Sequence, residues 1–117
     1  MKVWEKSIQN PSKTPWADWI INGNKIWEGR LCRDDWMNVC VDDIIIFKYD
    51  DNKKLKVVVT ELKHFADFGE AFRQLGIDLV PIDGISVEQV ESLYMQFYSK
   101  EDTMRYGVVA VGVKPLD

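Results

Sequence analysis

The chain has 117 residues, 46% of them hydrophobic and 12% aromatic, which is unlike a disordered protein and enough for one domain over residues 1–117 with a buried core. Its formal net charge of −4 argues against a protein that coats duplex nucleic acid, because such binding neutralises many phosphates, but a local basic cleft stays compatible with it. The apolar runs are much shorter than a membrane span and no signal-peptide pattern is present, so we expect a soluble, cytoplasmic protein with no membrane partner.

A short strand and a helix are the first predicted elements. Residues 2–8 place apolar side chains among charged ones, which indicates an extended segment. Thr14 is the predicted N-cap of the helix that follows, because Pro15 suits the first helical position and Gly23 supplies the usual left-handed terminator. The sequence therefore predicts a short helix that ends just before Gly23.

An extended segment follows the helix and carries the most specific charge cluster of the chain. From Lys25 to about residue 31 the pattern is that of a strand, and its alternation places Glu28 beside Arg30. One interpretation is an edge strand with ordinary surface ion pairs, which stabilise a fold only weakly. Another is a ligand site, because Gly23 lets the backbone turn tightly and leaves room for a ligand. A desolvated Lys25 could then act as a base or nucleophile, and Arg30 could bind a phosphate or carboxylate.

The middle of the chain predicts an antiparallel pair of strands. Residues 33–38 carry turn formers and predict a helical turn. Residues 44–49 are β-branched and aromatic, which is typical of a strand covered on both faces. Residues 50–52 form a hairpin connection to a returning strand over residues 55–62.

Two helices and a last strand complete the prediction. Capping-box signals open helices over residues 68–75 and 87–98. Residues 99–102 indicate a polar turn, and residues 107–113 predict a strand that is apolar on both faces. Together these elements predict a mixed α+β unit, namely a small curved sheet or barrel with helices packed outside it.

Residues suited to other chemistry are few. His64 is the only histidine and lies at the end of a predicted strand, where an accessible or core-edge position is favoured over a catalytic one. Cys32 and Cys40 lack the paired ligand spacing of a zinc site, and without a secretion signal they predict reduced thiols. We therefore expect no metal site and no cofactor.

Four of the five tryptophans fall into two pairs with different expected roles. Helical spacing assigns Trp16 and Trp19 to the core. Trp27 and Trp36 bracket the charged cluster and could stack on a nucleobase, although core packing is the favoured interpretation for them as well.

Residues 23–30 match the pattern G-x-K-x-x-E-x-R, by which the chain resembles the ASCH domain family of the PUA-like superfamily. Asp42-Asp43, where that family usually has a Gly-Asp pair before a strand, and residues 98–109 extend the likeness. It covers nearly the whole chain, roughly residues 15–113.

The resemblance implies a PUA-like α+β fold, a small mixed β-barrel with flanking helices, and a cleft lined by Lys25, Glu28 and Arg30. Strict alternation points Lys25 away from Glu28. Such a cleft therefore needs Lys25 to belong to the turn before the strand.

The function implied by the resemblance is binding of RNA or a nucleotide-like ligand, and we expect a module for single-stranded RNA. The candidate binding residues are Gly23, Lys25, Trp27, Glu28, Arg30, Trp36, Tyr98 and Ser99. Some relatives are amidohydrolases acting on acetylcytidine, and that alternative makes Lys25 and Glu28 catalytic. Because those relatives have a threonine where this chain has Glu28, binding is favoured over hydrolysis. A ribonuclease using Lys25 with Tyr98 or Ser99 is a further alternative.

Overall fold

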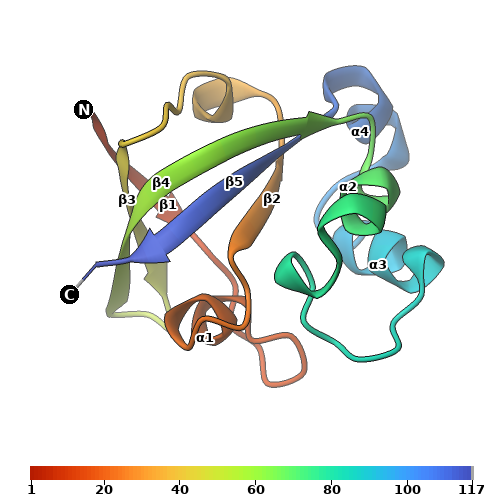
Figure 1. The fold of residues 1–117 in the computed structure, drawn as a ribbon, viewed down its shortest axis with the longest axis horizontal. Helices are drawn as coiled ribbons and strands as arrows, with labels where there is room; N and C mark the ends of the chain where they lie inside the picture. The colour runs from red at the N-terminus through yellow and green to blue at the C-terminus, as the bar shows by residue number, and fades with distance from the viewer. Residues whose placement is uncertain (117) are drawn as a thin grey trace.

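A curled sheet with helices around it forms the protein, whose computed structural model describes residues 1–116. Within these residues there are five strands and four α-helices, so the α+β prediction is confirmed (Figure 1). The strands are β1 (Val3–Ser7), β2 (Trp27–Leu31), β3 (Ile44–Tyr49), β4 (Lys53–Phe65) and β5 (Val108–Pro115). The helices are α1 (Trp16–Ile21), α2 (Phe68–Leu75), α3 (Val87–Tyr94) and α4 (Lys100–Tyr106), with 3-10 turns at η1 (Asp34–Met37) and η2 (Gly76–Asp78).

The sheet is an open half-barrel whose edge strands are β1 and β2. Its strand order is β1-β3-β4-β5-β2; β1 runs parallel to β3, and the other neighbouring pairs are antiparallel. Arg30 of β2 donates a hydrogen bond across the opening to the carbonyl oxygen of Ser7 at the end of β1, at 2.8 Å. The curl therefore brings the two edges of the sheet within reach of one side chain.

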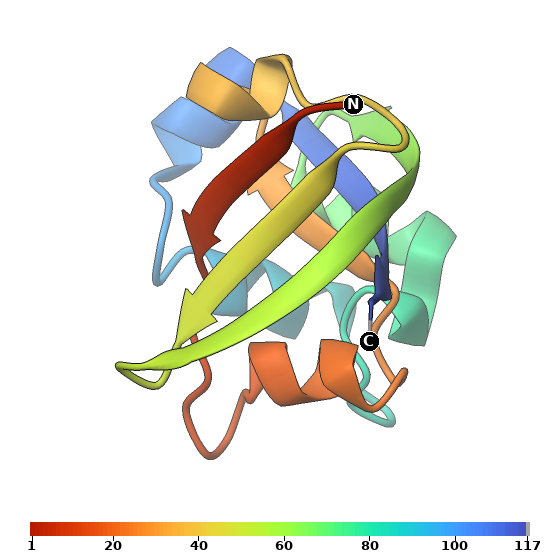
Figure 2. The ribbon, with the colours of Figure 1, turned by 90° about the vertical axis from the view of Figure 1, so that its left-hand side faces the viewer.

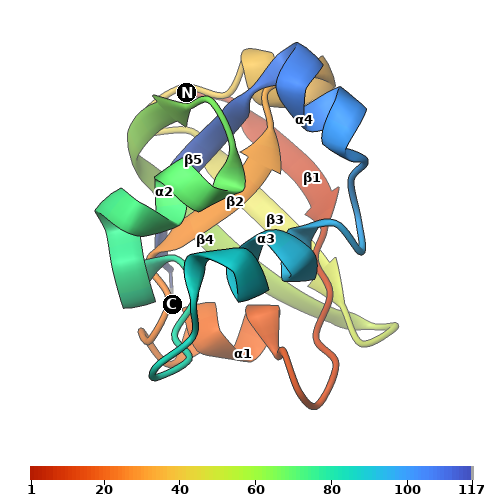
Figure 3. The same cartoon turned by 90° about the vertical axis from the view of Figure 1, so that its right-hand side faces the viewer.

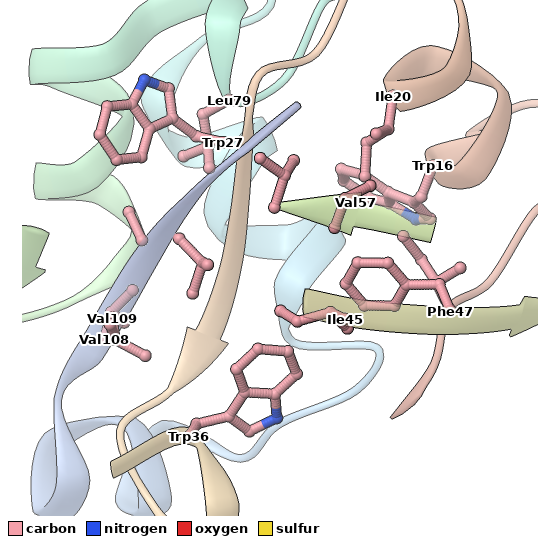
Figure 4. Packing of buried hydrophobic residues seen from close by; sticks show 14 of the residues in the cluster. Trp16, Ile20, Trp27, Trp36, Ile45, Phe47, Val57, Leu79, Val108 and Val109 are labelled. Carbon is pink, nitrogen blue, oxygen red and sulfur yellow. The ribbon is translucent and has the colours of Figure 1, made fainter. Parts of the chain in front are cut away.

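Apolar side chains from all five strands fill the concave side of the sheet. Ile45 and Phe47 of β3 and Val57 of β4 are fully buried there, and Ile20 packs against them from α1 (Figure 4). Removing such side chains from water is the dominant favourable contribution to folding. Helix α1 covers one end of the half-barrel, and α2, α3 and α4 pack beyond β2 (Figures 1 and 3).

The strand pair β3–β4 confirms the predicted hairpin and corrects one feature of it. Asp50 and Asp51 adopt positive φ angles of 44° and 65° in the three-residue turn, residues 50–52, that joins the paired Tyr49 and Lys53. Residues 44–49 were predicted to be covered on both faces, but Ile44 and Ile46 are only half-buried. Figure 2 shows why: no helix lies over the outer face of β1, β3 and β4.

The start of α1, the end of α3 and the presence of α4 differ from the prediction. No side chain caps α1, so Thr14 is not its N-cap. Helix α3 ends at Tyr94 rather than near residue 98. The predicted polar turn at residues 99–102 is the start of α4, where the Ser99 hydroxyl accepts a hydrogen bond from the backbone N–H of Asp102 at 3.0 Å. Within residues 1–116, every helix is too short or too polar to span a bilayer.

A buried carboxylate fixes the start of the sheet. Asp43, only 4% exposed, accepts hydrogen bonds from the Trp4 indole N–H at 2.9 Å and from the backbone N–H groups of Lys2 and Cys40 at 2.9 and 2.8 Å. The Trp4 hydrogen bond is the largest influence that lowers the pKa of Asp43, and the two backbone hydrogen bonds add to it. Asp43 thus ties β1 to the loop before β3.

Replacing Asp43 with asparagine should lower the free energy of unfolding by about 2 to 3 kcal/mol, because an amide NH₂ would face donors that now bind a carboxylate. Since its folded-state pKa is lowered, Asp43 stabilises the fold above the ordinary value of 3.8 and less as the pH falls through the folded-state pKa. Urea denaturation at neutral pH and below pH 4 measures both effects. The matched control is Asp42→Asn: Asp42 is exposed, and asparagine tolerates its φ of 75°. Equal stability of the two variants would contradict the role of Asp43.

Candidate functional site

Lys25 lies in the turn between α1 and β2, and its side chain is buried. Gly23, with a φ of 83°, ends α1 in the left-handed conformation that favours glycine, and β2 begins only at Trp27. The Lys25 ammonium donates hydrogen bonds to the carbonyl oxygens of Trp27 and Leu79, and its Nζ lies 3.6 Å from Glu28 Oε1. The requirement that Lys25 sit in the turn and meet Glu28 is therefore confirmed.

The environment of Lys25 makes its protonation sensitive to pH near neutrality. Burial is the largest influence and lowers the pKa of Lys25 from 10.5 to about 8, while the Glu28 carboxylate works against that shift. Its Nζ also lies 5.0 Å from the centre of the Trp16 ring, close enough for a cation–π contact. At neutral pH the group is a buried cation whose partners are one carboxylate and two carbonyls.

Glu28 joins Lys25 to Arg30. Its Oε2 accepts a hydrogen bond from Arg30 Nε at 2.9 Å and lies 2.8 Å from Arg30 Nη2 in the same ion pair. The guanidinium carbon of Arg30 lies 4.9 Å from the Trp36 ring centre and 5.7 Å from that of Phe47. Burial acts to lower the pKa of Arg30, but the Glu28 carboxylate leads the opposing influences and the net shift is upward. Both cations of the motif thus stay charged at neutral pH around one carboxylate.

A pocket of about 150 Å³ opens beside this cluster, between the two edges of the half-barrel. Its walls are residues 7–9 at the end of β1, residues 28–30 of β2, Trp16 of α1, and Tyr94, Phe97 and Tyr98 at the end of α3 and in the turn after it. Figure 3 shows α3 crossing in front of β2 and of the lower end of β1, with α1 below. The pocket is therefore assembled from four segments that are distant in sequence.

Two wall residues carry buried polar atoms without a hydrogen-bond partner in residues 1–116. These atoms are the indole Nε1 of Trp16 and the hydroxyl of Tyr94. Burying a donor or acceptor without a hydrogen-bond partner destabilises a fold by about 1 to 3 kcal/mol. Such atoms are therefore rare in native proteins. A bound ligand that pairs with these atoms would recover that free energy.

The position of Tyr94 depends on its neighbours in the fold. Its ring stacks on Phe68 at a centroid distance of 3.9 Å. A Cβ atom at Gly29 would lie only 3.1 Å from the Tyr94 hydroxyl, so the glycine of β2 makes room for this side chain. Burial and then the Glu28 carboxylate raise the pKa of Tyr94 well above 10, which keeps its hydroxyl protonated and able to donate.

The structure places the predicted site residues in different surroundings. Glu28, Arg30 and Tyr98 line the pocket. Lys25 is buried behind Glu28, and Trp36 packs on the guanidinium of Arg30.

The remaining candidates lie away from the pocket walls. Trp27 lies on the opposite side of β2 from Trp16 and Trp36 (Figure 4). Gly23 is an exposed turn residue, and the Ser99 hydroxyl caps α4.

Trp16 and Tyr94 are pocket residues that the sequence did not single out. Both have the helical spacing of core residues, and core packing was the interpretation favoured for Trp16. Two signals were available in the sequence. Buried tryptophans and tyrosines usually form a hydrogen bond through the indole N–H or the hydroxyl, so both residues call for a polar partner. The glycine at position 29, inside a strand, indicates that another side chain approaches the backbone closely there.

Metal-ligand geometry is not found among residues 1–116, where no three His, Cys, Asp or Glu side chains are grouped for an ion. Cys32 is half-buried and Cys40 exposed, and they are unpaired with each other.

Comparisons with known proteins give a consistent family. The family model of the ASCH domain matches residues 12–117. A crystal structure of the hypothetical protein PH0355 is 31% identical with a TM-score of 0.84, covering 97% of this chain and 99% of that one. The solution structure of protein PF0455 from Pyrococcus furiosus is 28% identical with a TM-score of 0.77, covering 98% of each chain.

A more distant structure extends the likeness in fold. The ASCH domain from Lactobacillus crispatus is 14% identical with a TM-score of 0.70, covering 97% of this chain and 79% of that one. The predicted PUA-like fold, a small barrel-like sheet with flanking helices, is thereby confirmed. Among curated proteins no match was found.

Proposed function

This chain belongs to the ASCH domain family, whose members are generally thought to bind RNA, and from that premise we propose that it binds single-stranded RNA by taking one base into the pocket between β1 and β2. The observation that carries the proposal is a pair of buried polar atoms, Trp16 Nε1 and the Tyr94 hydroxyl, that find no hydrogen-bond partner in the described part of the chain, residues 1–116. Both lie in walls that also contain Glu28 and Arg30. A ligand with hydrogen-bond donors and acceptors on its edge could pair with both of these atoms.

The size and chemistry of the pocket suit a single base. Its volume of about 150 Å³ is several times that of a water molecule, yet below the roughly 300 Å³ at which pockets for drug-sized ligands begin. A nucleobase presents donors and acceptors on its edge, and proteins that read single-stranded RNA stack splayed bases on aromatic rings. Here Phe97 and Tyr98 offer rings, the Glu28 carboxylate accepts hydrogen bonds, and the Trp16 indole N–H donates one.

The three charged residues of the motif have different roles in this proposal. We assign Arg30 the contact with the phosphate or a base carbonyl, because its guanidinium reaches the pocket wall and stays charged. Glu28 holds the guanidinium in place and offers its carboxylate to a ligand donor. Lys25 is a positioning residue, because its ammonium is occupied by Glu28 and two carbonyls behind the pocket.

Hydrolysis is less well supported by the same geometry. A lysine nucleophile or base needs a free lone pair near the substrate, whereas the Lys25 amine is surrounded by acceptors and is absent from the pocket walls. For a ribonuclease, Ser99 is already engaged as the cap of α4. We therefore place RNA binding ahead of both enzymatic alternatives.

Tyr94→Phe tests the proposal with the loss of a single oxygen atom. Because the hydroxyl has no hydrogen-bond partner among residues 1–116, the free energy of unfolding should stay the same or rise slightly. Affinity for a labelled single-stranded RNA should fall about fivefold to tenfold, as for the loss of one hydrogen bond. Fluorescence anisotropy measures the affinity, and urea denaturation measures the stability.

Tyr106→Phe is the matched control, since Tyr106 is 37% exposed and lies outside the pocket walls. It should leave RNA affinity unchanged. If Tyr94→Phe binds a set of RNA oligonucleotides of varied sequence as well as the unmodified protein does, the base does not occupy this pocket.

A further inference from the structure

The open outer face of the sheet carries a group of lysines, and we propose that it binds the phosphate backbone of the RNA strand whose base enters the pocket. We name it the lysine face and define it by Lys48 of β3, Lys54 and Lys56 of β4, and Lys114 of β5. This inference rests on the proposed function, which it extends from one base to the strand that carries it. Figure 2 shows β1, β3 and β4 with no helix over this side.

Strand pairing gathers the four lysines on one side of the sheet. Lys48 lies directly opposite Lys54 in the β3–β4 ladder. Lys56 is two residues further along β4 and so points to the same side, since side chains alternate between the faces of a strand. Lys114 lies opposite Val58, the next residue of β4 on that side. All four side chains belong to exposed residues, whereas Leu55 and Val57 between them are buried.

The charge of this face differs in sign from the charge of the whole chain. The formal net charge is −4, yet the lysine face has four cations, and among residues 1–116 the one carboxylate within ion-pair distance of any of them is Glu5, whose Oε1 lies 3.6 Å from Lys48 Nζ. Further along the same side, Glu61 is already paired with Lys63 at 3.7 Å. Among residues 1–116, no carboxylate lies within ion-pair distance of Lys54, Lys56 or Lys114.

Such an arrangement carries a cost in the free protein. Like charges directly opposite each other on neighbouring strands destabilise a sheet, and Lys48 and Lys54 are such a pair. Partly exposed Ile44, Ile46 and Val58 lie among the lysines without a helix to cover them. A polyanion laid across the face would relieve the repulsion, because lysines neutralise phosphates and release counterions.

The lysine face is continuous with the pocket, which is the reason to favour RNA over other anionic partners. Ser7 lies beside Lys48 in the β1–β3 ladder and also forms part of the pocket wall. Its carbonyl oxygen accepts the hydrogen bond from Arg30. Lys48 lies on the next strand, β3, and Lys54 and Lys56 lie on β4, which is two strand spacings or about 10 Å from β1. A strand with one base in the pocket can therefore follow this line with its phosphates.

The test compares RNA lengths and salt dependence. We would measure binding of a labelled mixed-sequence 12-nucleotide single strand and of a dinucleotide to the double variant Lys54→Gln/Lys56→Gln. Affinity for the longer strand should fall about tenfold at low salt, and the slope of log affinity against log salt should shrink by about 0.7 for each lysine removed. Dinucleotide affinity should stay unchanged. The double variant Lys13→Gln/Lys100→Gln removes the same charge from exposed positions elsewhere and is the matched control.

The outcomes separate this inference from the proposed function. If the lysine-face variant keeps the affinity and salt slope of the longer strand while Tyr94→Phe weakens binding, the lysine face is wrong and the pocket stands. If the lysine-face variant weakens binding and Tyr94→Phe does not, the pocket is wrong and the face stands. Loss of binding to phosphatidylserine vesicles, with RNA affinity retained, would assign the face to membranes and overturn the inference.

Discussion

Replacing Glu28 with glutamine should lower the free energy of unfolding by about 3 to 5 kcal/mol, the usual cost of removing one partner from a buried ion pair. Glu28 is 5% exposed and is the carboxylate shared by Lys25 and Arg30. Glutamine keeps the shape but leaves both cations without a counter-charge. RNA affinity should also fall by about tenfold or more, because Arg30 loses the carboxylate charge that holds its guanidinium at the pocket wall.

The Glu28 variant makes a second, independent prediction about Lys25. Since the Glu28 carboxylate works to raise the pKa of Lys25 against the effect of burial, its loss should move that pKa below about 8. An NMR titration of the lysine side chain measures the shift, and urea denaturation measures stability. Glu61→Gln is the matched control, because Glu61 is an exposed carboxylate 3.7 Å from Lys63. It should change stability by less than about 0.5 kcal/mol. Similar stabilities for the two variants would contradict the central role of Glu28.

Replacing Lys25 with methionine should lower the free energy of unfolding at neutral pH by about 2 to 4 kcal/mol. Methionine fills much of the same space but leaves the carbonyl oxygens of Trp27 and Leu79 without their donor. The loss is smaller than for Glu28 because Arg30 still neutralises the carboxylate, and because removing a buried charge recovers part of its desolvation cost.

The contribution of Lys25 to the free energy of unfolding should depend on pH. The folded protein loses the Lys25 proton near pH 8, whereas the unfolded chain keeps it up to about 10.5. Between these values the unfolded state binds more protons, so the contribution of Lys25 to stability rises with pH, by up to about 3 kcal/mol. The stability of the methionine variant should lack this rise.

Denaturation curves at pH 7 and pH 9.5 compare the two proteins, with Lys13→Met as the control at an exposed lysine. The gap between Lys25→Met and the unmodified protein should widen at the higher pH. A gap that narrows would show that Lys25 is not a buried cation with a lowered pKa.

Elements with a strong local pattern were predicted well. Strands β3 and β5 have runs of β-branched residues, and the turn between β3 and β4 has the residues that a tight hairpin needs. Residues 99–102, where α4 begins, predicted only a polar turn, because the seven residues of this helix show no apolar periodicity. It forms through the Ser99 cap and through packing of Thr103, its one buried residue. Short helices of this kind depend on tertiary contacts more than on local propensity.

The outer face of β3 shows a second limit of sequence patterns. Residues 44–46 are three consecutive isoleucines, which predicts burial on both sides of a strand. The structure buries Ile45 and leaves Ile44 and Ile46 half-exposed. Whether a helix covers a given face depends on the path of the chain around the sheet, which the pattern within one strand does not contain.

By itself, the sequence determined the charged motif at residues 23–30 and the placement of Glu28 beside Arg30, because the alternation of a strand is a local property. Only the tertiary structure decided that Lys25 is buried, since one of its acceptors is the carbonyl of Leu79, 54 residues away. The same holds for the pocket, which needs the curl of the sheet to bring β1 to β2, and α1 and α3 to supply Trp16 and Tyr94. Residues distant in the chain meet through packing of the whole core. Only that packing reveals which buried polar atoms have no hydrogen-bond partner within residues 1–116.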